Sequence, residues 1–164
     1  EMQALLDAPD RRQPHQRRDR ALLLFLYNTG ARASEAVDLT IGDVDSAVPA
    51  VTLHGKGNKN RRCPLWPTTL AALRELAGSR LGPERVFLNR KGRPLTRFGL
   101  HTLVERHALT AGRSVPSLRA KRVSPHTIRH YADLRTMPTG MQARSLSEPS
   151  GRAFVELERA SYAA

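Results

Sequence analysis

Two stretches decide how this chain folds: Thr-Gly-Ala-Arg-Ala-Ser-Glu at 29–35 and Pro-His-Thr-Ile-Arg-His at 125–130. The first ends an apolar run with a glycine turn and delivers Arg32. The second opens a helix and delivers His126 and Arg129. Guanidinium groups stay charged and match phosphate oxygens in planar pairs. We therefore expect the fold to join these distant segments into a phosphate-binding site.

The residues around these stretches predict a mainly α domain with a small antiparallel β-sheet of about three strands. Gly30 closes a buried helix, and Ser34 is the expected cap of the short helix that follows. Two apolar runs around a Gly/Asn loop predict a β-hairpin. The expected helices are 2–8, 19–28, one from Pro67, one capped by Thr96, one from Pro125 and a last one over 153–163. The expected strands are 48–53, 62–65 and 86–88, and residues 9–18 are expected to form a basic loop.

The charge of the chain indicates a polyanionic partner. Its 164 residues carry 27 Lys+Arg against 15 Asp+Glu, a formal net charge of +12. Such an excess points to nucleic acid, and its spread over loops and hairpins disfavours a membrane surface. Cys63 is the only cysteine, which excludes a disulfide framework and suits a reducing compartment.

The predicted hairpin tip carries Lys56 between two glycines. Such a tip can reach into a DNA groove, and its ammonium group can protonate a leaving oxygen. The neighbouring Lys59, Arg61 and Arg62 are predicted to bind DNA by neutralising backbone phosphates. The alternative for Lys56 itself is that it only neutralises backbone phosphates, as its neighbours do.

His126 lies three residues before Arg129, so both occupy one helical face. An imidazole there can accept or return a proton near neutral pH. His130, four residues after His126, raises the alternative of a metal site. The zinc-protease pattern requires Glu where this chain has Thr127, and a neighbouring arginine would repel a cation. We therefore expect no metal.

In order and spacing, the segments 21–39, 51–65 and 123–130 resemble the catalytic domain of the tyrosine recombinases, the phage integrase family. The resemblance implies that Arg32 and Arg129 clamp the scissile phosphate, Lys56 is the general acid and His126 belongs to the His-x-x-Arg box. Family members cut double-stranded DNA through a tyrosine, forming a 3′-phosphotyrosyl link without a cofactor. The resemblance also implies tetramers on DNA and a bacterial, cytoplasmic, nucleoid-associated protein.

The chain departs from the family pattern at both ends. The N-terminal DNA-clamping domain of the family is expected to be absent, and the chain begins with Glu1 rather than Met. Residues 1–130 are interpreted as the catalytic core and 131–164 as a divergent tail. Arg152 stands where the family has a second histidine or tryptophan, and Tyr162 falls near the position of the nucleophile.

Two explanations of the tail stay open: Tyr162 is the nucleophile of a divergent tail, or the tail is a shifted reading frame. Tyr131 is too close to Arg129 to attack in line within one subunit, and Tyr27 is expected inside a buried helix. The predicted function is therefore site-specific DNA recombination or integration. The alternatives are a catalytically impaired DNA-binding remnant and a type IB topoisomerase-like nicking-closing enzyme.

Overall fold

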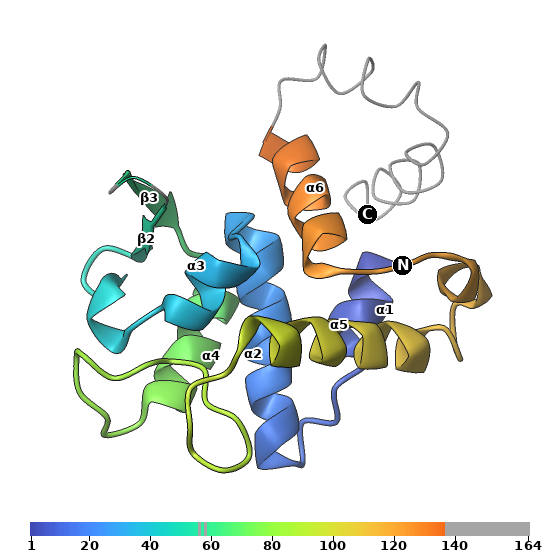
Figure 1. The fold of residues 1–164 in the computed structure, drawn as a ribbon, viewed down its shortest axis with the longest axis horizontal. Coiled ribbons are helices and arrows are strands. Elements are labelled where there is room, and N and C mark those ends of the chain that lie inside the picture. The colour runs from blue at the N-terminus through green and yellow to red at the C-terminus, as the bar shows by residue number, and fades with distance from the viewer. Residues whose placement is uncertain (56, 58, 137–164) are drawn as a thin grey trace.

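The computed structural model describes residues 1–55, 57 and 59–136. Helices dominate these residues, with a small sheet at one side (Figure 1), as the sequence predicts. In chain order the elements are α1 (Met2–Asp7), α2 (Pro14–Thr29), α3 (Ala33–Asp38), the 3-10 helix η1 (Ile41–Asp43), β1 (Val44–Asp45), β2 (Ala50–His54), β3 (Asn60–Pro64), α4 (Pro67–Ala77), α5 (Arg97–Ala111), the 3-10 helix η2 (Pro116–Ala120) and α6 (Pro125–Thr136).

Helix α2 is the centre of the core, and it packs against α1, α3, α4 and α6. All residues from Ala21 to Tyr27 are buried, because a helix that is apolar on every side must be covered on every side. The ring of Phe25 lies 5.8 Å from that of Phe87, and Tyr27 lies 5.6 Å from Trp66. Tyr27 is thus buried, as predicted.

The sheet has three antiparallel strands in the order β1-β2-β3. Val51 in β2 pairs with Val44 on one side and Cys63 on the other, and His54 pairs with Asn60 next to the loop that joins β2 and β3. The predicted hairpin is therefore confirmed. No helix in the described part of the chain is long and apolar enough to cross a membrane.

The third strand is not the one that the sequence predicted. Residues 86–88 belong to no strand. Val86 N donates to Leu39 O, and Phe87 O accepts from Leu95 N, but these hydrogen bonds accompany only isolated β-bridges. Val86 and Phe87 are buried in the core instead, and Phe87 is fully buried. The third strand of the sheet is the short β1. It pairs with β2 because Asp45 accepts from the amides of Ala47 and Val48 and so turns the chain back into β2.

Two helix starts also differ from expectation. α2 begins at Pro14, inside the predicted loop 9–18, because proline suits the first helical position and arginines favour helix. Ser34 does not cap α3; the helix begins at Ala33, and the carboxylate of Glu35 accepts from Arg32 N at 2.8 Å. The Thr96 cap is confirmed, since its hydroxyl accepts from Gly99 N at 3.0 Å.

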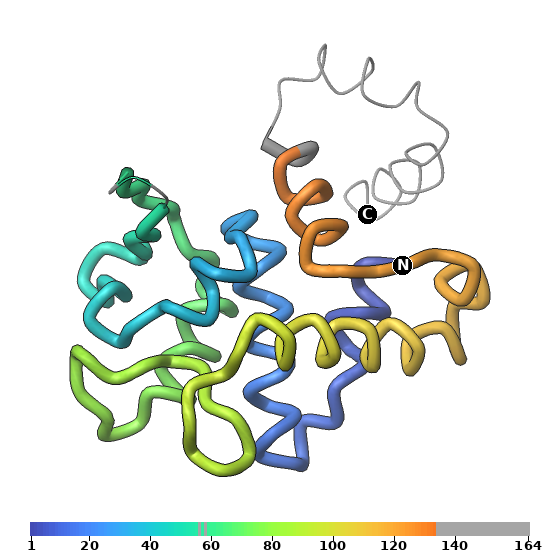
Figure 2. The backbone as a smooth tube through the Cα atoms, viewed as in Figure 1, coloured from blue at the N-terminus to red at the C-terminus, as the bar shows by residue number. Residues whose placement is uncertain are grey.

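The start of the chain lies beside the segment that leads into α6 (Figure 2). Glu1 accepts a hydrogen bond from Lys121 at 2.7 Å and another from Ser117. α6 itself continues to Thr136, past the predicted boundary at residue 130. The expected helix over 153–163 lies outside the described residues.

Candidate active site

The turn between α2 and α3, which leads into Arg32, lies against α6. Gly30 ends α2 in the left-handed region, with φ 58°, and donates to Leu26 O at 3.0 Å. A Cβ atom at Gly30 would lie 3.1 Å from Asp133 Oδ1 and 3.4 Å from Ala132 Cβ. Glycine is therefore required both for the backbone conformation and for the close approach of the turn to α6.

Glu35 lies at the centre of the site, although sequence reasoning did not single it out as functional. Its side chain is only 3% exposed. Oε1 accepts from Arg32 Nη1 at 2.9 Å, and Oε2 accepts from Arg61 Nη2 at 2.9 Å. The Arg-x-x-Glu spacing at a helix start is a capping pattern, and it was the signal available in the sequence.

The charged state of Glu35 is favoured despite its burial. Burial raises the pKa of a carboxyl group, but the Arg32 amide and the Arg61 guanidinium lower the pKa of Glu35 below its ordinary value. A buried carboxylate that lost these partners would be costly. Glu35 therefore acts as a fixed negative charge that arranges the arginines around it.

Arg129 reaches the same carboxylate from α6. Its Nη1 donates to Gly30 O at 2.8 Å and lies 4.0 Å from Glu35 Oε2, while its Nε lies 3.5 Å from Asp133 Oδ2. The structure thus brings Arg32 and Arg129 together around Glu35. The Arg32 side chain is 60% exposed, so its guanidinium is accessible to an incoming anion.

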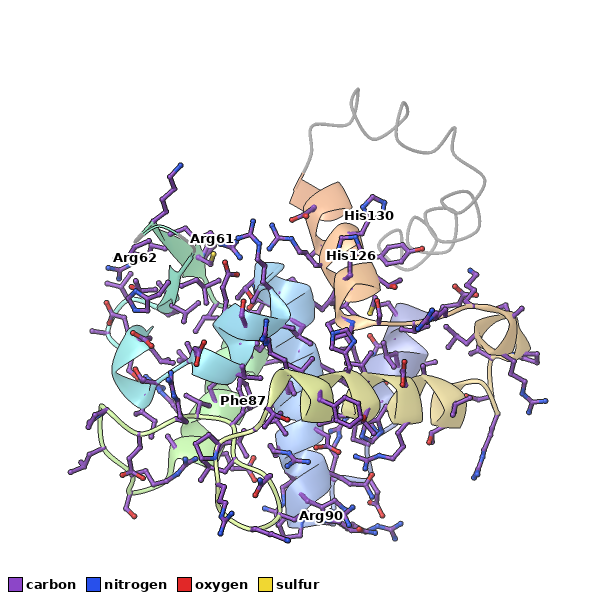
Figure 3. The ribbon with its side chains drawn as sticks, in the orientation of Figure 1. Arg61, Arg62, Phe87, Arg90, His126 and His130 are labelled. Carbon is purple, nitrogen blue, oxygen red and sulfur yellow. The ribbon has the colours of Figure 1, made fainter. Side chains whose placement is uncertain are left out.

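His126 and His130 lie on α6, as Figure 3 shows, and both are exposed. The cap of this helix is as predicted, with Thr127 N donating to Ser124 Oγ at 3.3 Å. His126 lies one helical turn before Arg129, so the imidazole and the guanidinium share one face of α6. Within residues 1–136, leaving out 56 and 58, no three His, Cys, Asp or Glu side chains cluster as metal ligands would.

The β2–β3 loop begins at Gly55, here called the hairpin base, and this residue lies close to Glu35. Gly55 N donates to Lys59 O at 2.8 Å. A Cβ atom at Gly55 would lie 3.0 Å from Lys59 O and 3.6 Å from Glu35 Oε1, so a larger residue would require the loop backbone to shift. Lys56, the predicted general acid, directly follows Gly55 but lies outside the described residues.

The three residues predicted to bind DNA differ in their surroundings. Lys59 is exposed beside the hairpin tip. Arg62 is exposed and pairs with Asp45 at 2.6 Å. Arg61 instead turns inward to Glu35. Their contacts with DNA stay a prediction, and for Arg61 the geometry offers a different partner.

The sequence has three tyrosines, and the two that the structure describes differ in their surroundings. Tyr27 is buried in the core. Tyr131 is half-buried, and burial raises its pKa to about 12, which makes its phenol a poor nucleophile near neutral pH. Tyr162 and Arg152 lie outside the described residues, so their roles stay predictions.

Known proteins resemble this chain over most of its length. The profile of the "Phage integrase family" matches residues 1–157. The chain is 38% identical over 143 residues to "Putative integrase/recombinase y4rD" of Sinorhizobium fredii, covering 84% of this chain and 51% of the relative. It is 32% identical over 162 residues to "Tyrosine recombinase XerD" of Halalkalibacterium halodurans, covering 94% and 52%. The chain thus spans about half the length of the curated relatives it matches.

Solved structures give the same fold. The XerH recombinase bound to difH substrate in a pre-cleavage complex superposes with a TM-score of 0.69 at 23% identity, covering 99% of this chain and 52% of that one. A post-cleavage complex of XerH gives 0.66 at 27% identity, covering 88% and 41%. With the family profile matching nearly the whole chain, this protein belongs to the phage integrase family, among the tyrosine recombinases.

Proposed function

We propose that this chain is the catalytic part of a site-specific DNA recombinase that cuts and rejoins double-stranded DNA. The observation that carries the proposal is the convergence of Arg32 and Arg129 on Glu35 beside the hairpin base. Two guanidinium groups next to an accessible surface suit paired hydrogen bonds to the non-bridging oxygens of a phosphodiester. The high positive charge of the chain supports a DNA partner.

In the proposed reaction a tyrosine hydroxyl attacks the phosphorus of one DNA strand. The new bond joins the tyrosine oxygen to phosphorus, and the bond from phosphorus to the 5′ oxygen breaks. Arg32 and Arg129 stabilise the charge on the non-bridging oxygens in the transition state. His126 accepts the proton of the attacking hydroxyl, and Lys56 donates a proton to the leaving 5′ oxygen.

Rejoining is the reverse reaction, in which a 5′-hydroxyl of another strand attacks the 3′-phosphotyrosyl link. The energy of the broken bond is kept in that link, so the reaction needs no nucleotide cofactor. We propose Tyr162 as the nucleophile, and assembly of several copies on DNA in the bacterial cytoplasm. Strand exchange between two duplexes requires such an assembly.

Covalent capture of DNA tests the proposal. The protein is incubated with a pool of nicked duplexes, and complexes that survive detergent are collected and sequenced. A metal-independent adduct supports the proposal, and Tyr162→Phe should abolish it while duplex binding persists. Salt-sensitive binding without an adduct would support a DNA-binding remnant instead, and an adduct unchanged in Tyr162→Phe would exclude Tyr162.

A further inference from the structure

Arg61 and Arg62 are neighbours on β3, but their side chains have different surroundings. Successive residues of a strand point to opposite faces, and Arg61 is paired with the buried Leu53 while Arg62 is paired with Thr52. The Arg61 side chain is 38% exposed and that of Arg62 is 55% exposed. Figure 3 labels both on the hairpin.

The guanidinium of Arg61 joins the hairpin to the turn that carries Arg32. Its Nη2 donates to Glu35 Oε2 at 2.9 Å and to Gly30 O at 3.3 Å. Its Nη1 donates to Thr29 O at 3.2 Å. Gly30 O also accepts from Arg129, so one carbonyl connects β3 with α6. Such a fork of contacts to separate acceptors requires the planar geometry of arginine.

The charges around Glu35 give this contact a consequence for anion binding. One carboxylate faces three guanidinium groups, those of Arg32, Arg61 and Arg129. If Arg32 turned from Glu35 toward a phosphate, the buried carboxylate would lose a partner, and leaving it uncompensated is costly. Arg61 approaches from the hairpin side and can keep Glu35 paired during that movement.

We propose that Arg61 is a positioning residue, which keeps Glu35 paired so that Arg32 and Arg129 can grip a phosphate, and which holds the hairpin base against this clamp. The phosphate partner in this inference rests on the proposed function, but the contact between Arg61 and Glu35 does not. Arg61 therefore differs from a surface arginine that only adds positive charge for DNA.

The test compares Arg61→Gln with Arg62→Gln, which removes the same charge from the next residue of the same strand. Affinity for orthovanadate, a phosphate-like anion, is measured together with affinity for generic duplex DNA. We expect Arg61→Gln to weaken orthovanadate binding about 10-fold and Arg62→Gln less than about 2-fold. Both should weaken duplex binding by a similar small factor. Equal losses of orthovanadate binding in the two variants would overturn the proposal.

A second measurement separates this inference from the proposed function. Carbon-13 NMR follows the titration of the Glu35 carboxyl group, which is independent of any phosphate. Arg61→Gln should raise the pKa of Glu35, because it removes a hydrogen bond and a nearby positive charge. An unchanged Glu35 pKa would overturn the role of Arg61, whereas wild-type protein that binds neither DNA nor orthovanadate would overturn the proposed function.

Arg61→Lys keeps the test decisive if Arg61→Gln does not fold. A lysine retains the charge but cannot reach Glu35 and both turn carbonyls at once. We expect the orthovanadate affinity of Arg61→Lys to lie between that of wild type and that of Arg61→Gln, and its duplex affinity to be unchanged. Orthovanadate binding equal to wild type would show that the fork of contacts is not needed.

Discussion

Of the carboxylates that the structure describes, Asp19 and Glu35 are each buried among basic side chains, yet only Glu35 lies at the candidate active site. Asp19 is fully buried between α2 and α5, where it accepts from Arg18, from Arg106 at 2.6 Å and from His107 at 2.9 Å. Arg18 also donates to Leu88 O, which fastens the 85–96 segment to α2. This cluster joins elements of the core to one another.

The Glu35 cluster differs in what its arginines can still reach. Arg32 follows the turn at Gly30, Arg129 reaches that turn from α6, and the hairpin base at Gly55 lies close to the same carboxylate. The comparison teaches that a buried carboxylate among arginines does not by itself indicate a binding site. The informative feature is the further groups beside the exposed arginine, since Arg129 and the hairpin base lie close to the same carboxylate.

The largest expected effect is on stability, at Asp19. Asp19→Ala leaves Arg18, Arg106 and the buried His107 without their carboxylate, which should cost about 3–5 kcal/mol of the free energy of unfolding. Urea denaturation measures this loss. The control is Asp7→Ala, since Asp7 pairs with Arg11 at the surface at 3.6 Å and should contribute less than about 1 kcal/mol. Equal losses at the two positions would contradict the structural role of Asp19.

The next prediction compares Arg32, which pairs with Glu35, with Arg106, which pairs with Asp19. The two side chains are similarly exposed, at 60% and 47%. Arg32→Ala should slow covalent capture of DNA about 10²–10³-fold, because it removes a donor to the transition state. Arg106→Ala should lower stability without changing the capture rate of the folded protein. A quenched time course of detergent-stable adduct measures both rates. Equal rate losses would mean that the two clusters do not differ in function.

A smaller effect is expected at the turn between the two arginines of the clamp. Gly30→Ala places a side chain at φ 58° and 3.1 Å from Asp133 Oδ1, which should cost about 1–2 kcal/mol of unfolding free energy. Gly82→Ala is the matched control, because its Cβ would meet only Gly42 Cα at 3.9 Å. Thermal unfolding of the two variants checks the difference, and a stable Gly30→Ala would show that the turn can relax.

The smallest effect concerns His54, a surface counterpart of the two buried clusters. Its Nε2 lies 2.8 Å from Asp43 Oδ1 and its Nδ1 lies 2.9 Å from Asn60 Oδ1, and these contacts raise the pKa of His54. A raised folded-state pKa adds stability that is fully present below the unfolded-state pKa and is lost as pH rises through the folded-state pKa.

The stability of wild type relative to His54→Gln should therefore be greater near pH 5 than near pH 8, a range about the usual histidine pKa. Denaturation at a series of pH values measures the difference. His101→Gln, at an exposed position on α5, is the control. A difference that grows with pH would contradict the protonated bridge.

Much of the fold follows from local patterns, which is why it could be predicted. The apolar run 21–27, the glycine at position 30 and the Ser-Pro start of α6 each act within a few residues, and all three predictions are confirmed. The prediction of a strand over residues 86–88 was wrong, because an apolar run of three residues looks the same whether it joins a sheet or is buried in a core. Phe87 meets Phe25, and only the packed fold shows this contact.

The sequence by itself determined which residue types are present for phosphate chemistry and that the chain is strongly basic. The tertiary structure alone decided which of them meet: Glu35 gathers Arg32, Arg61 and Arg129 from three separate elements. It also decided that Arg61 faces inward while its neighbour Arg62 faces outward. The physical reason is that the need of a buried carboxylate for cationic partners is met through space, and spacing along the chain does not reveal which cations will reach it.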